Sequence, residues 1–436
     1  MKRIILISLL ISLLISLLLP FKALAEDMKI FTLEHVLQIA SEKNRDIQKA
    51  MEYSRWVHGK YVEERAAAFP QFSMNGSGAA QQDKTMLLST GSSQDTLKSV
   101  SAEIGLTQTL FSWGKVGAAI RAAKEGLKTA EEQLRLYRQA AFRDVSVSFF
   151  DILLARQIHS IALQDLSQKE RHLEEARRKF TAGVATDYEV LAAEVAVENA
   201  RPEVIRSENQ IRTSLDRLRF LLAIEGADID VTGSLETSIL PVPVYQEIYS
   251  LAIKHRPEMK DLRLRSAIAG ELVNIAAAED KPRLEFKGGY GWKELDMGDM
   301  NLSGRAWNAG LYFSFPFFDG MRTRGKIMQA VSDRQSLKID ESKLADSIAL
   351  QARDALNSVN ESEKIVKALS GTVTQAEKLL FLSEKGYEFG VKIRLEVDDA
   401  ELKLQMAKAN LSRAWRDYRA ARVNLLWVMG VLGENN

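Results

Sequence analysis

The sequence predicts a mainly α-helical protein with a membrane β-barrel, assembled from two copies of one helix–hairpin–helix unit. Three observations lead to this fold class: short motifs that recur at a nearly constant offset, two helical stretches too long for a globular core, and two pairs of segments with alternating apolar and polar residues. The predicted organisation is a leader at 1–25, a first unit at 26–225, a linker at 226–244 and a second unit at 245–436.

The recurring motifs indicate an internal duplication. The segment LFSWG at 110–114 returns as PFFDG at 316–320, an offset of 206, and the Gly-Val pair at 183–184 returns at 390–391, an offset of 207. Pro70 returns as Pro282 at an offset of 212, so one segment between 70 and 111 differs in length between the units. A steady offset is the signature of repeated structural units. The shared positions are Phe111, Gly114, Phe317 and Gly320 where strands are predicted to join helices, and Gly183, Val184, Gly390 and Val391 at the predicted helix turns.

The first 25 residues have the layout of a secretory signal. Two basic residues precede an apolar run over 4–19, and Ala-Leu-Ala at 23–25 provides a small-residue cleavage site. We expect the mature chain to begin at Glu26, and we expect no membrane-spanning helix after it, because no later stretch approaches the roughly eighteen consecutive apolar residues that such a helix needs. The chain contains no cysteine, so neither a disulfide nor a lipid-bearing N-terminal cysteine is expected.

Two very long helices dominate the predicted structure. They cover about 112–180 and 318–386, and 69 residues at 1.5 Å each extend about 100 Å, which is wider than a globular core. Gly183 and Gly390 then reverse the chain, because glycine readily adopts the left-handed conformation that ends a helix. The return helices are predicted at about 187–222 and 396–429.

Each unit also contains a predicted β-hairpin. The strands lie at about 71–80 and 99–110 in the first unit and at about 283–292 and 306–316 in the second, where a polar connection over 293–305 separates them. One face of the second hairpin is apolar and rich in aromatic side chains, as is typical of strands that face lipid. These predicted membrane-facing aromatics are Tyr290, Trp292, Trp307, Phe313 and Phe315.

Four strands per chain imply that several copies share one barrel. Unpaired backbone groups in lipid cost several kcal/mol each, so a spanning sheet must close, and membrane barrels begin at about eight strands. The alternative is that the hairpins pack on a soluble core. It is disfavoured because the chain predicts no other element that could cover hairpins lying between such long helices.

Composition and motifs exclude several classes of function. The formal net charge of +1 becomes −2 once Lys2, Arg3 and Lys22 leave with the leader, so a nucleic-acid partner is not expected. The five histidines are scattered, without the spacing of metal or hydrolase motifs, and are most simply explained as helix-surface residues. We therefore expect no enzyme activity, no cofactor and no metal centre.

Taken together, the signal, the duplicated units, the junction motifs and the glycine turns followed by Ala-Glu helices resemble the TolC-like outer-membrane efflux family. The resemblance covers essentially the whole mature chain. It implies a homotrimer with a twelve-stranded barrel in the outer membrane, a helical barrel across the periplasm, and docking to a periplasmic adaptor and an inner-membrane pump of the RND, ABC or MFS class. The short C-terminus after Gly433 and the missing N-terminal cysteine depart from some members of the family.

The predicted mechanism lies at the helix turns. Glu396 and Asp399, at i and i+3, share one helical face just after Gly390, a spacing that by itself is typical of a solvated surface. The resemblance implies instead that these acids line the narrow end of the tube. It also implies that Tyr387, Lys392 and Glu189 hold the closed tip together and that the turns Gly183-Val184 and Gly390-Val391 contact the adaptor.

The predicted function is a passive exit duct of a tripartite efflux or type I secretion system, gated at its periplasmic tip. The alternative is a soluble periplasmic coiled-coil adaptor or binding protein that uses helical hairpins to bind partners. Such an adaptor would have no need of two aromatic strand pairs. The exported substrate and the pump class are not encoded in any feature of the sequence.

Overall fold

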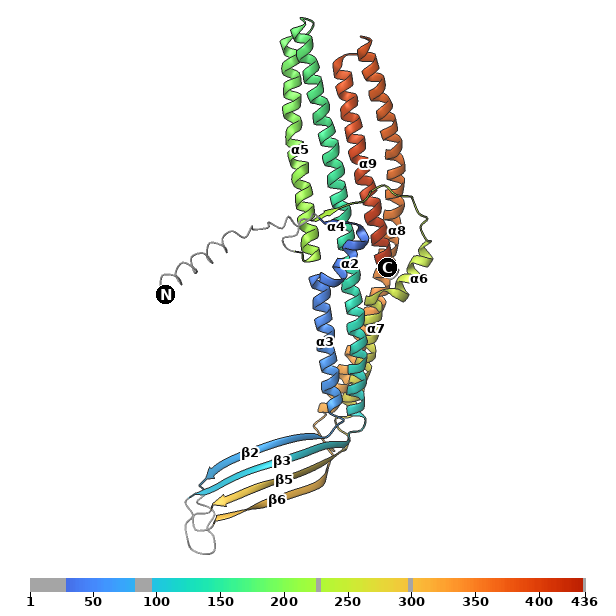
Figure 1. Ribbon diagram of the computed structural model, residues 1–436. Helices are drawn as coiled ribbons and strands as arrows, with labels where there is room; N and C mark the ends of the chain where they lie inside the picture. The colour runs from blue at the N-terminus through green and yellow to red at the C-terminus, as the bar shows by residue number, and fades with distance from the viewer. Residues whose placement is uncertain (1–28, 83–95, 225–228, 297–300, 434–436) are drawn as a thin grey trace, which may run out of the picture.

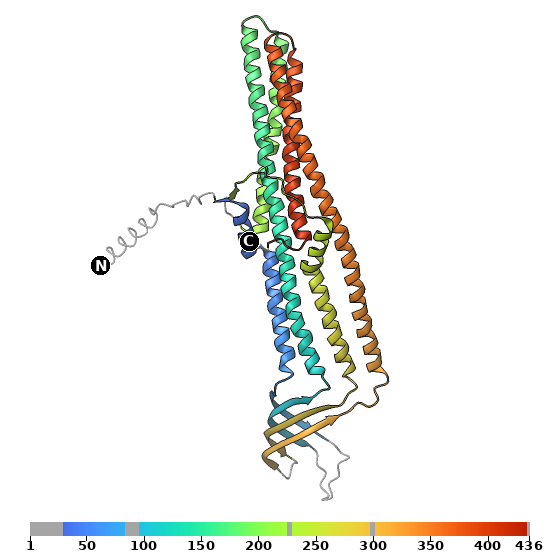
Figure 2. The same ribbon diagram turned by 90° about the vertical axis from the view of Figure 1, so that its right-hand side faces the viewer.

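The computed structural model describes residues 29–82, 96–224, 229–296 and 301–433. The predicted leader, most of the first hairpin loop and the start of the predicted linker lie outside these residues. The molecule is elongated, with a four-stranded sheet at one end and the turns of two helical hairpins at the other (Figures 1 and 2). Short helices and a two-stranded sheet surround the long helices near the middle of the molecule.

The two units repeat the same order of elements. The first contains β1 (Lys29–Phe31), α2 (Leu33–Lys43), α3 (Arg45–Ala66), β2 (Gln71–Gln81), β3 (Leu97–Phe111), α4 (Lys115–Thr181) and α5 (Asp187–Leu222). The second contains β4 (Ile229–Val231), α6 (Tyr245–His255), α7 (Pro257–Ala277), β5 (Arg283–Asp296), β6 (Asn301–Ser314), α8 (Arg322–Glu388) and α9 (Arg394–Val428).

The four long strands form one antiparallel sheet in the order β2-β3-β5-β6. Its register gathers the large apolar side chains on one face, since Ile104 lies opposite Tyr290, which in turn lies opposite Trp307. Polar residues such as Ser73, Ser77 and Glu103 alternate with them and lie on the other face. The second hairpin is longer than predicted, because its ladder continues through Leu295 and Leu302 and leaves little of the expected polar connection.

The junctions between strands and long helices contain residues with positive φ. Trp113 and Gly114 have φ of 52° and 82°, and Gly320 and Met321 have φ of 67° and 70°. This left-handed pair prevents the helix from starting earlier, so α4 begins at Lys115 and α8 at Arg322 instead of near 112 and 318.

The helices lie side by side in a curved layer. In the half with the hairpin turns the order is α5-α4-α9-α8, and in the half next to the sheet it is α3-α4-α7-α8 (Figure 1). The first unit therefore supplies one edge of every layer, through β2, α3 and α5. The second unit supplies the opposite edge, through β6 and α8.

Two apolar clusters fix the middle of the molecule. One joins α4 and α5 to α2 and β4 through residues such as Phe150, Leu218 and Val231, and the other joins α8 and α9 to α6 through residues such as Ile248 and Tyr418. The segment 226–244 was predicted as a linker only. It also contributes β4, which pairs in parallel with β1 and buries Ile229 and Val231.

One helix contains a stretch that is long and apolar enough to cross a membrane, contrary to the expectation that none would. This stretch lies in α4, and half of it is buried within the chain. Apolar residues of α4, including Val145, Phe149 and Ile152, belong to the mid-length cluster. The apolar character of this stretch is therefore explained by packing against α2, α5 and β4.

Candidate functional site: the helical tips

Each helical hairpin turns at a glycine with positive φ, 73° at Gly183 and 72° at Gly390. The amide of Val184 donates to the carbonyl of Lys179 at 3.0 Å, and the amide of Val391 donates to that of Gly386 at 2.8 Å. These bonds span five residues and close the helix ends in the Schellman arrangement. Val184 and Val391 are 75% and 81% exposed, so both turns present apolar side chains at the extremity of the molecule.

The return helices begin with side-chain caps. Thr186 accepts a hydrogen bond from the amide of Glu189 at 3.3 Å at the start of α5. At the start of α9 the carboxylate of Glu396 accepts from the amide of Ile393 at 3.1 Å and lies 3.4 Å from the ammonium of Lys392. Glu396 and Lys392 are thus paired within one turn of the same hairpin.

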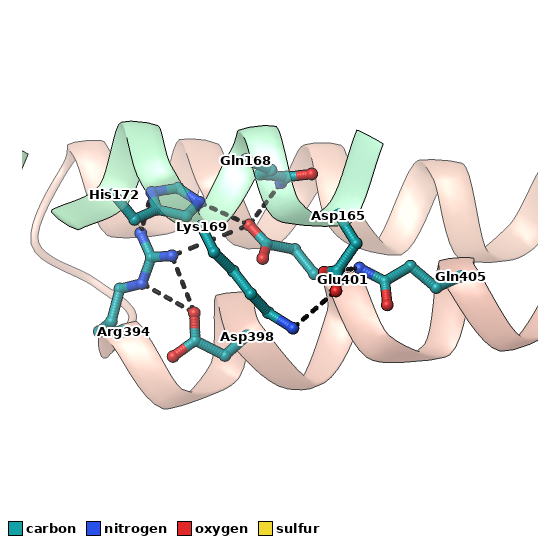
Figure 3. Close-up of polar contacts among 8 residues, drawn as sticks. All are labelled: Asp165, Gln168, Lys169, His172, Arg394, Asp398, Glu401 and Gln405. Carbon is teal, nitrogen blue, oxygen red and sulfur yellow. Dashed lines mark hydrogen bonds and ion pairs between the residues drawn. The ribbon is translucent and has the colours of Figure 1, made fainter. Parts of the chain in front are cut away.

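A polar network joins α4 to α9 across the line where the two hairpins meet (Figure 3). Glu401 is its centre, and only 5% of this residue is exposed. Its carboxylate accepts from His172 Nε2 at 2.9 Å and from the amide of Gln168. Arg394 donates to Nδ1 of His172 at 2.8 Å and to the carboxylate of Asp398 at 2.8 Å.

The partners of His172 define the roles of its two ring nitrogens. A guanidinium can only donate, so Nδ1 accepts from Arg394 and Nε2 donates to Glu401. Burial opposes ionisation of Glu401, but its interactions with His172, the charge of Arg394 and the hydrogen bond from Gln168 outweigh burial and hold the pKa of the carboxyl below its usual value. The carboxylate at the centre of the network is therefore ionised.

A second set of contacts continues the junction toward the middle of the molecule. Gln405 of α9 donates to the carboxylate of Asp165 on α4, which also pairs with Lys169 at 2.7 Å. Further along, Arg416 of α9 binds Asp151 of α4 at 2.5 Å. Charged and amide side chains therefore connect α4 and α9 over much of the distance from the turns to the central clusters.

Tyr387 makes a contact between the hairpins at the very end of α8. Its hydroxyl accepts from the ammonium of Lys179 on α4 at 3.3 Å, and the same ammonium lies 5.1 Å from the centre of its ring. Lys179 is also bound at 2.8 Å by Glu175. The bond to Glu175 and the contact with Tyr387 raise the pKa of Lys179, so it stays charged at neutral pH.

The other residues predicted for the gate lie near these contacts. Asp399 pairs with Lys403 one turn along α9 at 2.5 Å, and both side chains are about half exposed. Glu189 lies with Tyr387, Lys179 and Arg394 around a cavity of about 550 Å³ between the tips. Glu396 and Asp399 remain predictions as residues that line a lumen, because their neighbours in one chain are lysines of their own hairpin.

The predicted sheet residues are also exposed in the single chain. Tyr290, Trp307 and Phe313 are 55%, 76% and 69% exposed, and all three lie on the apolar face. Trp292 lies on that face opposite Arg305, whereas Phe315 follows the end of β6. At the junctions, Phe111 packs edge-on against Trp113 with ring centres 5.4 Å apart, and Phe317 is 86% exposed.

Sequence reasoning missed the network around Glu401. It placed His172 among surface histidines, although the side chain is only 24% exposed. The repeated Ala-Glu pair is the signal that was available, since Ala400-Glu401 corresponds to Ala193-Glu194. The two glutamates differ in setting, because Glu194 is 41% exposed and pairs with Arg177 of its own hairpin at 2.7 Å. In the part of the chain that the structure describes, no group of three or more acidic or histidine residues could hold a metal ion.

An apolar-faced sheet with two open edges, continued by paired helices far longer than a globular domain, is the architecture of outer-membrane channel proteins. The chain belongs to the outer membrane efflux protein family, whose model matches residues 36–223 and 248–431. It is accordingly an outer-membrane channel protein that extends into the periplasm, and not an enzyme or a soluble adaptor.

Relatives support this assignment over most of their length. Outer membrane protein TolC of Vibrio cholerae is 24% identical over 77% of this chain and 78% of its own. The alkaline protease secretion protein AprF of Pseudomonas aeruginosa is 25% identical over 85% of this chain and 78% of its own. Among solved structures, the CmeC outer membrane channel of Campylobacter jejuni superimposes with a TM-score of 0.81 at 16% identity, covering 92% of this chain and 85% of that one.

Proposed function

We propose that three copies of this chain form one continuous duct, in which the sheets close a twelve-stranded barrel in the outer membrane and the helices form a tube across the periplasm. The duct is passive and serves as the exit of an efflux or secretion machine. Energy and substrate choice come from an inner-membrane pump, which a periplasmic adaptor joins to the helical tips.

The open edges of the single chain carry this proposal. The outer backbone groups of β2 and β6 have no partner strand in the four-stranded sheet, and every residue of β2 is exposed. A sheet with an apolar face and two unpaired edges is unstable in lipid. Closure by further copies removes both edges, and three copies supply twelve strands, which is within the range of membrane barrels.

The edges of the helical layers match those of the sheet. α3 and α5 lie on the side of β2, and α8 lies on the side of β6. One copy can therefore place β6 and α8 against β2, α3 and α5 of the next. Such a contact joins unlike surfaces and closes into a ring when the rotation between copies is a simple fraction of a turn.

The tips are the proposed site of docking and gating. Val184 and Val391 present exposed apolar side chains beside the glycine turns, which suits contact with the hairpin of an adaptor. Glu396 and Asp399 would supply six carboxylates near the narrow end of a three-copy tube, and such a ring attracts cations. Tyr387, Lys392 and Glu189 lie where weak contacts could hold the tip closed and yield to a docked partner.

The names of relatives indicate the kind of cargo. AprF is an alkaline protease secretion protein, and a relative from Pseudomonas putida, 22% identical, is the outer membrane protein of a toluene efflux pump. A wide lumen selects by charge and width, which is compatible with either cargo. The inner-membrane pump determines whether a protein or a small molecule is exported through this duct.

Purification from outer membranes tests the proposal. We expect a detergent-solubilised particle of three chains by light scattering, with heat-dependent mobility on gels and defined conductance steps in planar bilayers. A monomer without conductance would overturn the proposal. Replacing Glu396 and Asp399 by Gln and Asn should lower the preference for cations over anions, measured as a reversal potential in a salt gradient.

A further inference from the structure

We infer that a second copy of this chain binds along β6 in one defined register, with Tyr312 directly opposite Ser77 of the partner subunit and Leu311 opposite Gly78 of the partner subunit. The inference rests on the proposed ring, but it goes further, because it assigns the residue contacts at the junction between copies.

The register follows from the internal repeat once a β-bulge is taken into account. Between β3 and β5 the ladder shifts by one residue between Thr109 and Phe111, so β3 has one extra residue there. After the bulge, a residue of β3 therefore corresponds to the residue of β6 that lies 206 positions later, as Phe111 does to Phe317. Before the bulge, the corresponding residue of β6 lies 207 positions later. Between β2 and β5 the offset is 212, as for Pro70 and Pro282.

The two hairpins provide an independent check of these offsets. In the first hairpin Ser77 lies opposite Ser101. Adding 212 to the first position and 207 to the second gives Gly289 and Asn308, and these two residues lie opposite each other in the second hairpin. The offsets therefore reproduce a pairing that was not used to derive them.

The junction between the two units within one chain then serves as the template for the junction between copies. Within the chain β3 lies beside β5, with Gly105 opposite Gly289 and Ile104 opposite Tyr290. The residue equivalent to Gly105 on β6 is Tyr312, and the residue equivalent to Gly289 on β2 is Ser77. In the same way, Leu311 of β6 is equivalent to Ile104, and Gly78 of β2 is equivalent to Tyr290.

Side-chain chemistry agrees with this register. Leu311 and Phe313 are 65% and 69% exposed in the single chain and lie on the apolar face of β6. The register places them beside Gly78 and Gly76 of the partner subunit, which lie on the apolar face of β2 and leave space for large neighbours. A shift of one residue would turn the apolar face of one strand toward the polar face of the other.

The offset between the two units also relates residues of the helical tips, but there the equivalent positions hold different residue types. At the tip offset of 207, His172 corresponds to Leu379 and Glu401 corresponds to Glu194. Where His172 meets Glu401 within one copy, the junction between copies brings Leu379 toward Glu194 of the partner subunit. The contact between His172 and Glu401 thus has no counterpart between copies, whereas the amide of Gln168 corresponds to that of Gln375, so the two kinds of junction differ at the histidine position.

Cysteine cross-linking in outer membranes tests the register, and the chain contains no native cysteine to interfere. Ser77→Cys is combined in turn with Tyr312→Cys, Gly310→Cys or Ser314→Cys, which all lie on the same face of β6. Directly opposed positions have Cβ atoms about 4.5–5.5 Å apart and diagonal positions about 7–8 Å, so mild oxidation favours the direct pair. We expect at least a fivefold higher yield of covalent dimer and trimer for Tyr312→Cys. Gly78→Cys with Leu311→Cys is a second pair on the apolar face.

The possible outcomes distinguish a failure of the proposed register from a failure of the proposed duct. Strongest cross-linking through Gly310→Cys or Ser314→Cys would overturn the register while the three-copy ring stands. A three-chain particle with no cross-linking in any pair would overturn the pairing of β6 with β2. A particle of one chain would overturn the ring itself. Single-cysteine variants, which should give no covalent trimer, control for random collision.

Discussion

His172 of α4 and Glu401 of α9 are joined by a hydrogen bond of 2.9 Å across the line where the two helical hairpins of one chain meet. The carboxylate is almost fully buried, and Arg394 contacts the other nitrogen of the same imidazole. One imidazole therefore connects a buried carboxylate to a guanidinium at the junction between the hairpins.

Replacing Glu401 by leucine should loosen the two tips. His172 and Gln168 would keep partly buried donors without an acceptor, which costs up to about 1–3 kcal/mol, and amide hydrogen exchange over the first turns of α9 should accelerate. Glu401→Gln keeps an acceptor and should restore much of the protection. The matched control is Glu194→Leu, because its exposed pair with Arg177 contributes at most about 1 kcal/mol. Equal acceleration in both leucine variants would contradict the assigned role of Glu401.

Replacing His172 by leucine should weaken the same junction, because Glu401 would lose a donor and Arg394 would lose an acceptor. We expect the distribution of distances between spin labels on α4 and α9, at Glu174→Cys and Lys403→Cys, to broaden in the His172→Leu variant. His159→Leu is the control, because His159 bonds Ser207 within one hairpin at 3.0 Å. Equal broadening in both variants would contradict the role of His172 in this junction.

Glu401 should make the junction sensitive to acid. Its pKa is depressed in the folded protein, so its contribution to stability is fully present above the ordinary pKa of a glutamate and is lost as the pH falls through the lower folded value. The distances between the same spin labels should therefore broaden over that acidic range, and Glu401→Gln, which cannot ionise, should abolish this pH dependence. A pH dependence that persists in Glu401→Gln would show that another group is responsible.

Tyr387→Phe should raise single-channel conductance in planar bilayers, because it removes the hydroxyl that binds Lys179 of the other hairpin. Lys179→Met should have a similar effect, and the double variant should add little, since both changes break one contact. Lys392→Ala alone should change conductance less, because Lys392 pairs with Glu396 of its own hairpin. Unchanged conductance in the double variant would rule out this contact as a latch.

Replacing either of two glycines in the second helical hairpin by alanine should change the stability of the folded protein, in opposite directions for the two positions. Gly390 has φ of 72°, where a Cβ is strained, so Gly390→Ala should destabilise the folded protein by about 1 kcal/mol. Gly371 lies inside α8 with open space around it, so Gly371→Ala should stabilise by about 0.5–1 kcal/mol. Thermal unfolding in detergent measures both. Destabilisation by Gly371→Ala would show that this position is covered in the assembled protein.

Local features of the sequence predicted most of the fold. Apolar spacing and the glycine turns indicated the long helices, and alternation around Tyr290 and Trp307 indicated a sheet face, because these patterns depend only on the period of a helix or strand. Helix starts were less accurate, because the positive φ of Trp113 and Met321 is not evident from residue types that rarely adopt it. β1 and β4 were missed because three residues carry too little periodicity to be recognised.

The sequence by itself determined that this chain is two copies of one unit, with four strands, two long helical hairpins and an offset that any assembly must respect. Only the tertiary structure decided which faces of those helices meet. His172 and Glu401 are 229 residues apart, and their contact depends on how α4 and α9 are rotated by the packing of the central clusters. Rotation about a helix axis is set by the sum of many distant apolar contacts. For that reason no local pattern could place the imidazole against the buried carboxylate.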